Sequence, residues 1–254
     1  MSVLSKLKEA VRGSGLYAVY RKNRPALLNA LHIELVFPIQ VETPVALLGS
    51  ENWGYRVTED LLHSGDDRPP VAYAFGLGDD ISFEKDVICR LNTTLYAFDA
   101  MPAVIQKYRD RVAGMRMLEY ALSDHDGKAM FYFPVNPAHI SGALDTEYNW
   151  HELSKTGVEV EVRRLSSIMA ELGHDHIDLL KMNVEGAEYY VVPDILKSGL
   201  SISEIALAVH GRFMKHGYRR DKRLLKQMNR AGYSVAYYDY SNARVLFVRT
   251  PSGE

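Results

Sequence analysis

The chain has 254 residues, of which 47% are hydrophobic and 24% are charged, and its formal net charge is -2. This length suits one large α/β domain with an appendage, and the composition is that of a soluble globular protein. The near-neutral charge excludes a general electrostatic attraction to nucleic acid or to anionic membranes. The single cysteine, Cys89, excludes an internal disulfide framework and a cysteine-rich zinc module.

The first 33 residues carry leucine and valine at helical spacings, interrupted by Gly13, Gly15 and Pro25. We therefore predict a broken helical arm that either packs on the main domain as a lid or mediates partner binding, including formation of a homo-oligomer. No apolar run reaches the roughly 18 residues that span a bilayer, and the first residues lack the apolar core of a secretory signal. These features predict a cytoplasmic protein without a transmembrane segment.

The candidate domain boundary is the polar break His-Ser-Gly-Asp-Asp-Arg-Pro-Pro at residues 63–70. Glycine, proline and charged residues in such a cluster favour a loop over a helix or strand. We therefore predict an N-terminal helical and loop extension over residues 1–66 and the main domain over residues 67–254.

The main domain opens with Val-Ala-Tyr-Ala-Phe-Gly-Leu-Gly-Asp-Asp-Ile-Ser-Phe-Glu at residues 71–84, which predicts a buried strand, a turn with Gly76 and Gly78, and the start of a helix. Asp99 follows at the end of a second apolar run, Leu-Tyr-Ala-Phe. This order is typical of a nucleotide-binding half-unit, in which the glycines let the backbone approach the ligand and the acid binds ribose hydroxyls. The pattern serves NAD and S-adenosylmethionine alike, and an ordinary strand-to-helix turn is the structural alternative.

Strand and helix patterns alternate from residue 71 onward, which predicts a mostly parallel sheet with helices on both faces. The last two strands, 233–240 and 244–248, are too close in sequence for a crossover helix, so they must pair antiparallel. A nicotinamide-binding Rossmann domain usually keeps alternating units to its end, whereas a class I S-adenosylmethionine methyltransferase ends in such a hairpin. The other expected elements are strands at 95–98, 115–120, 128–133, 158–162, 177–183 and 205–209, with 128–133 and 158–162 as a meander on one edge, and helices at 102–111, 165–172, 184–196 and 219–230.

Residues 179–188, Leu-Leu-Lys-Met-Asn-Val-Glu-Gly-Ala-Glu, resemble the Leu-Leu-Lys-Ile-Asp-Val-Glu-Gly-Ala-Glu signature of the FkbM family of methyltransferases. Residues 75–84 resemble the family's Gly-x-Gly-x-Asp-x-Ser-Phe turn, and residues 121–127 resemble its Ala-Leu-Ser-Asp-x-x-Gly segment. The resemblance covers residues 47–249. It implies a Rossmann-like class I methyltransferase fold with a mostly parallel seven-stranded sheet and a C-terminal antiparallel hairpin, while the predicted N-terminal helical arm lies outside the resemblance. It also implies transfer of a methyl group from S-adenosylmethionine to a hydroxyl oxygen of a sugar, glycolipid or natural product.

The resemblance, together with position after each strand, predicts the residues that bind S-adenosylmethionine and its product S-adenosylhomocysteine. Asp99 is expected at the ribose and Asn183 at the methionine end. Ser123 or Asp124 is expected near the adenine, although Ser-Asp-x-x-Gly is also a common turn. The predicted cofactor contacts are Phe75, Gly76, Leu77, Gly78, Asp80, Ser82, Asp99, Ala100, Ser123, Asp124 and Asn183.

Two residues depart from the family pattern. Ala74 stands where an acid usually precedes the first glycine by two residues, so the ammonium group of the cofactor needs another anion. We expect Asp80 to supply it, with Asp79 as the other nearby acid. Asn183 replaces the aspartate of the signature, and an amide is neither an anion nor a base.

His210 is the first choice for the catalytic base, because it ends a strand at the predicted ligand edge and ordinarily titrates near neutrality. Its alternative is a structural histidine under a loop. Glu185 is the second candidate, since a position at the start of a helix would keep it ionised. It either orients the acceptor hydroxyl, acts as base or caps its own helix. His139 and Ser141, in a long loop, are the tentative acceptor contacts.

Two further clusters have simpler explanations. His174, Asp175 and His176 precede a strand at the opposite edge of the sheet, so we predict a turn there and no metal site. The basic stretch 215–226 predicts a solvated helix face, with contact to an anionic acceptor as the alternative. The competing functions are an NAD-dependent oxidoreductase and a methyltransferase-like domain that binds without catalysis, whereas a nucleic-acid substrate is not expected.

Overall fold

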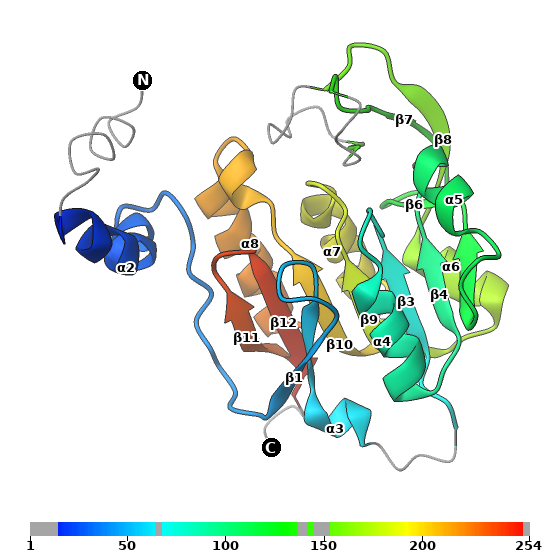
Figure 1. Cartoon of the computed structure of the whole chain (residues 1–254), viewed down its shortest axis with the longest axis horizontal. Helices are drawn as coiled ribbons and strands as arrows, with labels where there is room; N and C mark the ends of the chain where they lie inside the picture. Colours follow the sequence, from blue (N-terminus) through cyan, green and yellow to red (C-terminus); the bar gives the residue numbers. More distant parts are fainter. Residues whose placement is uncertain (1–14, 64–67, 137–141, 145–152, 251–254) are drawn as a thin grey trace.

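The computed structural model describes residues 15–63, 68–136, 142–144 and 153–250. Its centre is a seven-stranded sheet in the order β11-β12-β10-β9-β3-β4-β5 (Figure 1). All strands from β10 to β5 in this order are parallel, while β12 runs antiparallel to both β10 and β11. The predicted Rossmann-like sheet with a C-terminal antiparallel hairpin is confirmed. Its strands are β3 (Ala72–Phe75), β4 (Leu95–Phe98), β5 (Met115–Leu118), β9 (His176–Met182), β10 (Ser201–Ala208), β11 (Tyr233–Asp239) and β12 (Arg244–Arg249).

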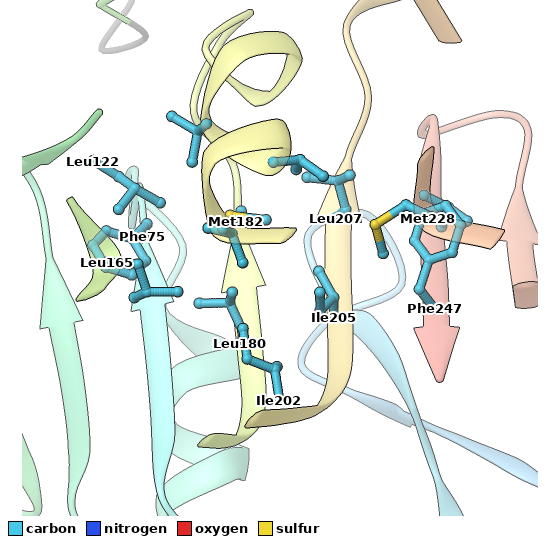
Figure 2. Close-up of a cluster of buried hydrophobic side chains, with 14 of the residues drawn as sticks. Phe75, Leu122, Leu165, Leu180, Met182, Ile202, Ile205, Leu207, Met228 and Phe247 are labelled. Atoms are coloured by element: carbon cyan, nitrogen blue, oxygen red, sulfur yellow. The ribbon is translucent and has the colours of Figure 1, made fainter. Parts of the chain in front are cut away.

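Both faces of the central strands are buried, which explains their continuous apolar runs. All four residues of β3 are buried. Tyr73 and Phe75 point into the larger core cluster, and Ala72 and Ala74 point into the cluster on the opposite face. Figure 2 shows the larger cluster, in which Phe75 and other side chains of the sheet pack against Leu165 and Met228 from two helices.

Helices cover both faces of the sheet, as the alternating pattern predicts. Helices α6, α7 and α8 cover one face through Leu165, Val191 and Leu224 respectively. Helix α4 covers the other face through Phe83 and Val87. None of the described helices is long and apolar enough to cross a membrane. The helices are α2 (Gly15–Ala30), α3 (Glu59–Leu62), α4 (Ser82–Leu91), α5 (Pro102–Tyr108), α6 (Leu165–Leu172), α7 (Glu188–Lys197) and α8 (Gly217–Arg230), with a 3₁₀ turn η1 (Gly211–Phe213).

The meander expected at a sheet edge forms a separate three-stranded sheet instead. Here β8 (Val158–Arg163) pairs antiparallel with β7 (Gly127–Phe131) and parallel with β6 (Ala121–Leu122). Ala121 and Leu122, directly before the Ser-Asp-x-x-Gly segment, therefore form a strand. Phe131 of β7 packs with Met101 and Val104, so this small sheet lies against the chain that follows β4.

The first part of the described chain lies against the C-terminal hairpin. Helix α2 continues past Pro25, contrary to the predicted break. It is anchored by buried Leu28 and by Arg24, which donates to Glu34 and to the Tyr240 hydroxyl. In the chain that follows α2, the backbone N–H of Gln40 donates a hydrogen bond to β11. The small antiparallel sheet of β1 (Val45–Leu48) and β2 (Tyr55–Thr58) shares the core cluster of α4. The predicted boundary at 66–67 falls outside the described residues.

Candidate active site

The glycine turn after β3 is fixed by its neighbours on both sides. Gly76 adopts a left-handed backbone with φ +76° and donates its N–H to the Phe98 carbonyl at 2.9 Å. A Cβ atom on Gly76 would lie 2.0 Å from the Asn183 carbonyl oxygen. The close approach of the chain at the end of β9 therefore requires glycine at this position. The absence of a side chain also lets a ligand approach the backbone. Gly78 is also left-handed, with φ +73°.

Asp99 lies at the end of β4 with both carboxylate oxygens facing backbone donors. Oδ2 accepts the Leu77 N–H at 2.9 Å, and Oδ1 accepts the Met101 N–H at 2.8 Å. Burial raises the pKa of Asp99, while these N–H groups and Lys181 oppose the shift. Because a carboxylate offers about four acceptor positions, the two bonds leave capacity for a pair of ribose hydroxyls.

A pocket of about 600 Å³, partly open to solvent, lies at the carboxyl ends of β3, β4 and β9. This is the edge at which open α/β sheets bind ligands. Apolar side chains from the loop after β4 and from the small sheet form one wall, among them Met101, Leu122 and Phe131. Sequence reasoning missed this wall, because no local pattern shows that β7 returns to the main sheet. The pocket brings together seven residues singled out from the sequence: Phe75, Gly76, Gly78, Asp99, Ala100, Asn183 and Glu185.

Asp80 and Ser82 join the glycine turn to the loop after β1 and do not line this pocket. The Asp80 carboxylate accepts the Ser82 N–H at 2.8 Å and the Ser50 hydroxyl at 3.2 Å. Hydrogen bonds from Ser82 lower the pKa of Asp80, although burial opposes them. The Ser82 hydroxyl in turn accepts the Ser50 N–H at 2.8 Å. This geometry gives Asp80 a structural task, and its contact with a cofactor ammonium stays a prediction.

A buried ion pair lies beneath the glycine turn. Lys181 of β9 is the register partner of Ala74, and its ammonium lies 3.2 Å from Glu84 Oε1 and donates to the Gly76 carbonyl. The Lys181 and Glu84 residues are 3% and 1% exposed. Burial raises the pKa of Glu84, whereas the charge of Lys181 opposes that shift. The sequence does contain a signal for this pair, because a lysine inside the apolar run Leu-Leu-Lys-Met needs a buried counter-charge.

The turn between β9 and α7 is left-handed at two consecutive residues. Glu185 has φ +49° and Gly186 has φ +99°, so α7 begins only at Glu188 and not at Val184 as predicted. A left-handed non-glycine residue costs about 1–3 kcal/mol, and such strain is found most often at functional sites. Glu188 stabilises the turn by accepting the Gly186 N–H at 2.9 Å. Glu185 therefore lies before α7, outside its first turn.

His210 is clamped between two glutamates at the end of β10. Its Nδ1 and its backbone N–H lie 3.0 Å and 2.8 Å from Glu188 Oε1, and its Nε2 lies 3.4 Å from Glu185 Oε2. Burial acts to lower the pKa of His210, but the charges of Glu188 and Glu185 outweigh it and raise that pKa to about 9. The expected titration near neutrality is therefore wrong. With this raised pKa the imidazole is protonated at neutral pH, and of the two candidates Glu185 lines the pocket whereas His210 does not.

A second buried pair continues this network away from the pocket. The Tyr189 hydroxyl donates to Asp221 Oδ1 at 2.6 Å. Burial raises the pKa of Asp221 to about 7, although the bond from Tyr189 opposes the shift. Sequence patterns did not indicate these residues, because α7 and α8 bring them together only in the folded chain.

The remaining predicted residues lie away from the pocket lining or outside the described chain. Leu77 donates its backbone N–H to Asp99. Ser123 is buried, and its backbone N–H donates to the Arg163 carbonyl at 2.9 Å. Asp124 contacts the neighbouring His125. The tentative acceptor residues His139 and Ser141 lie outside the described residues.

The His174–His176 segment lies at the opposite edge of the sheet, as expected from its position before β9. His174 Nδ1 lies 2.6 Å from the Tyr73 hydroxyl, and His176 contacts Asp175 and Asp178. Within the part of the chain that the structure describes, no group of three or more histidine, cysteine, aspartate or glutamate residues is arranged to hold a metal ion.

The strand order and the carboxyl-edge pocket define a Rossmann-like domain of the class I methyltransferase type. The model of the methyltransferase FkbM domain matches residues 72–235, and the chain belongs to this family. The chain is 29% identical over 153 residues to the 2-O-methyltransferase NoeI of Sinorhizobium fredii, a match that covers 54% of this chain and 61% of that protein. It thus spans less than two thirds of that relative. The solved structure of methyltransferase FkbM from Methylobacillus flagellatus KT aligns with 70% of this chain and 43% of its own, at 12% identity and a TM-score of 0.40.

Proposed function

We propose that this protein transfers a methyl group from S-adenosylmethionine to a hydroxyl oxygen of a sugar, a glycolipid or a related small molecule. The observation that carries the proposal is a single pocket lined by the glycine turn, by Asp99 and by Glu185. It thus combines a nucleotide-binding edge with a candidate proton acceptor. Membership of the FkbM family and the likeness to a 2-O-methyltransferase support the same reaction class.

The residues at this edge fit S-adenosylmethionine. Asp99 has acceptor capacity left for ribose hydroxyls, and the apolar wall with Leu122 and Phe131 suits an adenine ring. Gly76 and Asn183 border the same pocket at the ends of β3 and β9, where the methionine part would bind. When bound, the cofactor supplies an electrophilic methyl group on a sulfonium.

Glu185 is the residue that would handle the proton of the acceptor. Formation of the oxygen–carbon bond would break the sulfur–methyl bond and release S-adenosylhomocysteine, and the Glu185 carboxylate would take the proton of the acceptor hydroxyl. His210, protonated at neutral pH and 3.4 Å away, holds Glu185 in position and is itself held by Glu188. A base of this kind contributes about 10² to 10⁴ in rate, and the rest comes from positioning the hydroxyl.

The proposal is tested by incubating the protein with S-adenosylmethionine labelled in its methyl group and a panel of hydroxylated sugars and glycolipids. We expect label in the acceptor as an alkali-stable ether. Asp99→Asn should reduce kcat/KM about tenfold to a hundredfold, because a hydrogen bond to a charged group contributes about 1.5–3 kcal/mol.

The matched control is Asp79→Asn, which removes the same charge from the neighbouring turn after β3. Asp79 is an exposed acid outside the pocket lining, and it pairs with Lys107 on the surface. This variant should keep wild-type activity. Equal losses in the two variants would contradict a binding role for Asp99, and nicotinamide-dependent oxidation without methyl transfer would contradict the proposed function itself.

A further inference from the structure

A second hollow lies next to the candidate active site, between the start of α7 and the first turns of α8. Its volume is about 790 Å³, part of it open to solvent. Among the described residues that line it, three are arginines and none is an aspartate or a glutamate. We call this hollow the arginine groove, and its polar lining consists of Arg219, Arg220, Arg223, Tyr189, His216 and Gln227.

Helix α8 carries an excess of positive charge. The helix contains six arginines and lysines and one acid, Asp221, which is buried and bonded to Tyr189. Arg219 and Arg223 are four residues apart, a spacing at which like charges destabilise a helix. Positive side chains are also unfavourable in the first turn of a helix, where Arg219 and Arg220 lie. An arrangement that opposes folding in this way indicates a ligand that compensates the charge.

The arginines are placed to bind such a ligand. Arg219 and Arg223 are exposed, and within the described part of the chain neither forms an ion pair with a carboxylate. Arg220 is held in place by its Nε, which donates to the Lys215 carbonyl at 3.1 Å, and by its guanidinium, which lies 5.8 Å from the centre of the Tyr189 ring. Guanidinium groups match the geometry of phosphate and sulfate oxygens and bind them with paired hydrogen bonds.

The groove and the candidate active site share one wall. Ala187 lines the pocket, and Tyr189 lines the groove. Residues two apart on a helix point in nearly opposite directions, so the start of α7 separates the two hollows. Glu188, between them, carries the bonds to His210. Figure 1 shows α7 and α8 side by side, and the two helices are in contact.

We propose that the arginine groove binds a tetrahedral oxyanion, a phosphate or sulfate monoester, on the acceptor whose hydroxyl is methylated in the candidate active site. This inference rests on the proposed function and narrows its substrate to an anionic acceptor. With the anion in the groove, an adjacent part of the same molecule extends past the start of α7 toward Glu185. The groove then selects the acceptor, and the pocket binds the cofactor.

The test uses the full chain and a matched pair of double variants. Arg219→Gln with Arg223→Gln removes two charges from the groove, and Lys226→Gln with Arg230→Gln removes two charges from the same helix outside it. Calorimetry measures binding of inorganic phosphate, inorganic sulfate and a hexose 6-phosphate. We expect each to bind the wild type, with affinity at least about tenfold lower in the groove variant and within about twofold in the control.

Three outcomes would overturn the inference: no binding of phosphate or sulfate by the wild type, equal weakening in the two variants, or no preference for the phosphorylated hexose over the unphosphorylated hexose in methyl transfer. The last outcome would mean that the arginine groove binds a free anion and not an anionic group of the acceptor. S-adenosylhomocysteine is titrated in parallel and should bind all three proteins equally. If the wild type failed to bind S-adenosylhomocysteine, the proposed function would be contradicted, while the binding of phosphate and sulfate could still be interpreted.

Discussion

Replacement of His210 by glutamine should destabilise the protein at low pH and have little effect at high pH. His210 is 7% exposed and faces Glu188, Glu185 and Asp221, and its pKa is raised from 6.5 to about 9. Protons therefore bind the folded state more tightly than the unfolded state. At about 1.4 kcal/mol per pKa unit, this stabilises the fold by about 3 kcal/mol. The contribution is fully present below pH 6.5 and is lost as the pH rises through 9.

The assay is urea unfolding of the wild type and of His210→Gln at pH 6 and pH 10. The difference in the free energy of unfolding between the two proteins should be about 3 kcal/mol larger at pH 6 than at pH 10. In this difference between the two proteins, the contributions of groups that titrate in both of them cancel. A difference that is equal at both pH values, or a His210 pKa below 7 in an NMR titration, would refute the ion-pair reasoning.

Three other substitutions test the site and its support. Glu185→Gln should lower kcat by about 10² to 10⁴ while the affinity for S-adenosylhomocysteine changes less than about twofold, and unchanged kcat would remove Glu185 as the proton acceptor. Lys181→Met should destabilise the fold by about 3–5 kcal/mol in urea unfolding, because it leaves the buried Glu84 unpaired. Adding Glu84→Gln should recover part of this loss, and no recovery would contradict the pairing. Gly76→Ala should cost at least about 1–3 kcal/mol in thermal unfolding, since φ is +76° and the Asn183 carbonyl blocks a Cβ atom, and a stable variant would contradict that geometry.

Periodicity and turn residues were sufficient to predict the main sheet. Buried runs such as Ala72–Phe75 mark parallel strands, and the short link between β11 and β12 leaves only antiparallel pairing. The pocket-lining residues that the sequence indicated, including Gly76, Asp99 and Asn183, all lie at or within three residues of a strand end. Their positions follow from topology, because the carboxyl ends of parallel strands meet at one edge.

The features that the sequence did not indicate arise from contacts between distant segments. The raised pKa of His210 depends on Glu188, which reaches it because the chain turns left-handed at Glu185. Helix periodicity extends α7 through this turn and gives no sign of it. The apolar run around Lys181 signals a buried counter-charge, but only the folded chain shows that Glu84 of α4 supplies it.

The central claim is that the pocket at the carboxyl edge binds S-adenosylmethionine. Its most direct test is calorimetric titration of the wild-type protein with S-adenosylhomocysteine and, separately, with NAD. The account predicts saturable one-site binding of S-adenosylhomocysteine that is weakened at least about tenfold by Asp99→Asn, with no binding of NAD. Binding of NAD, without binding of S-adenosylhomocysteine, would contradict it.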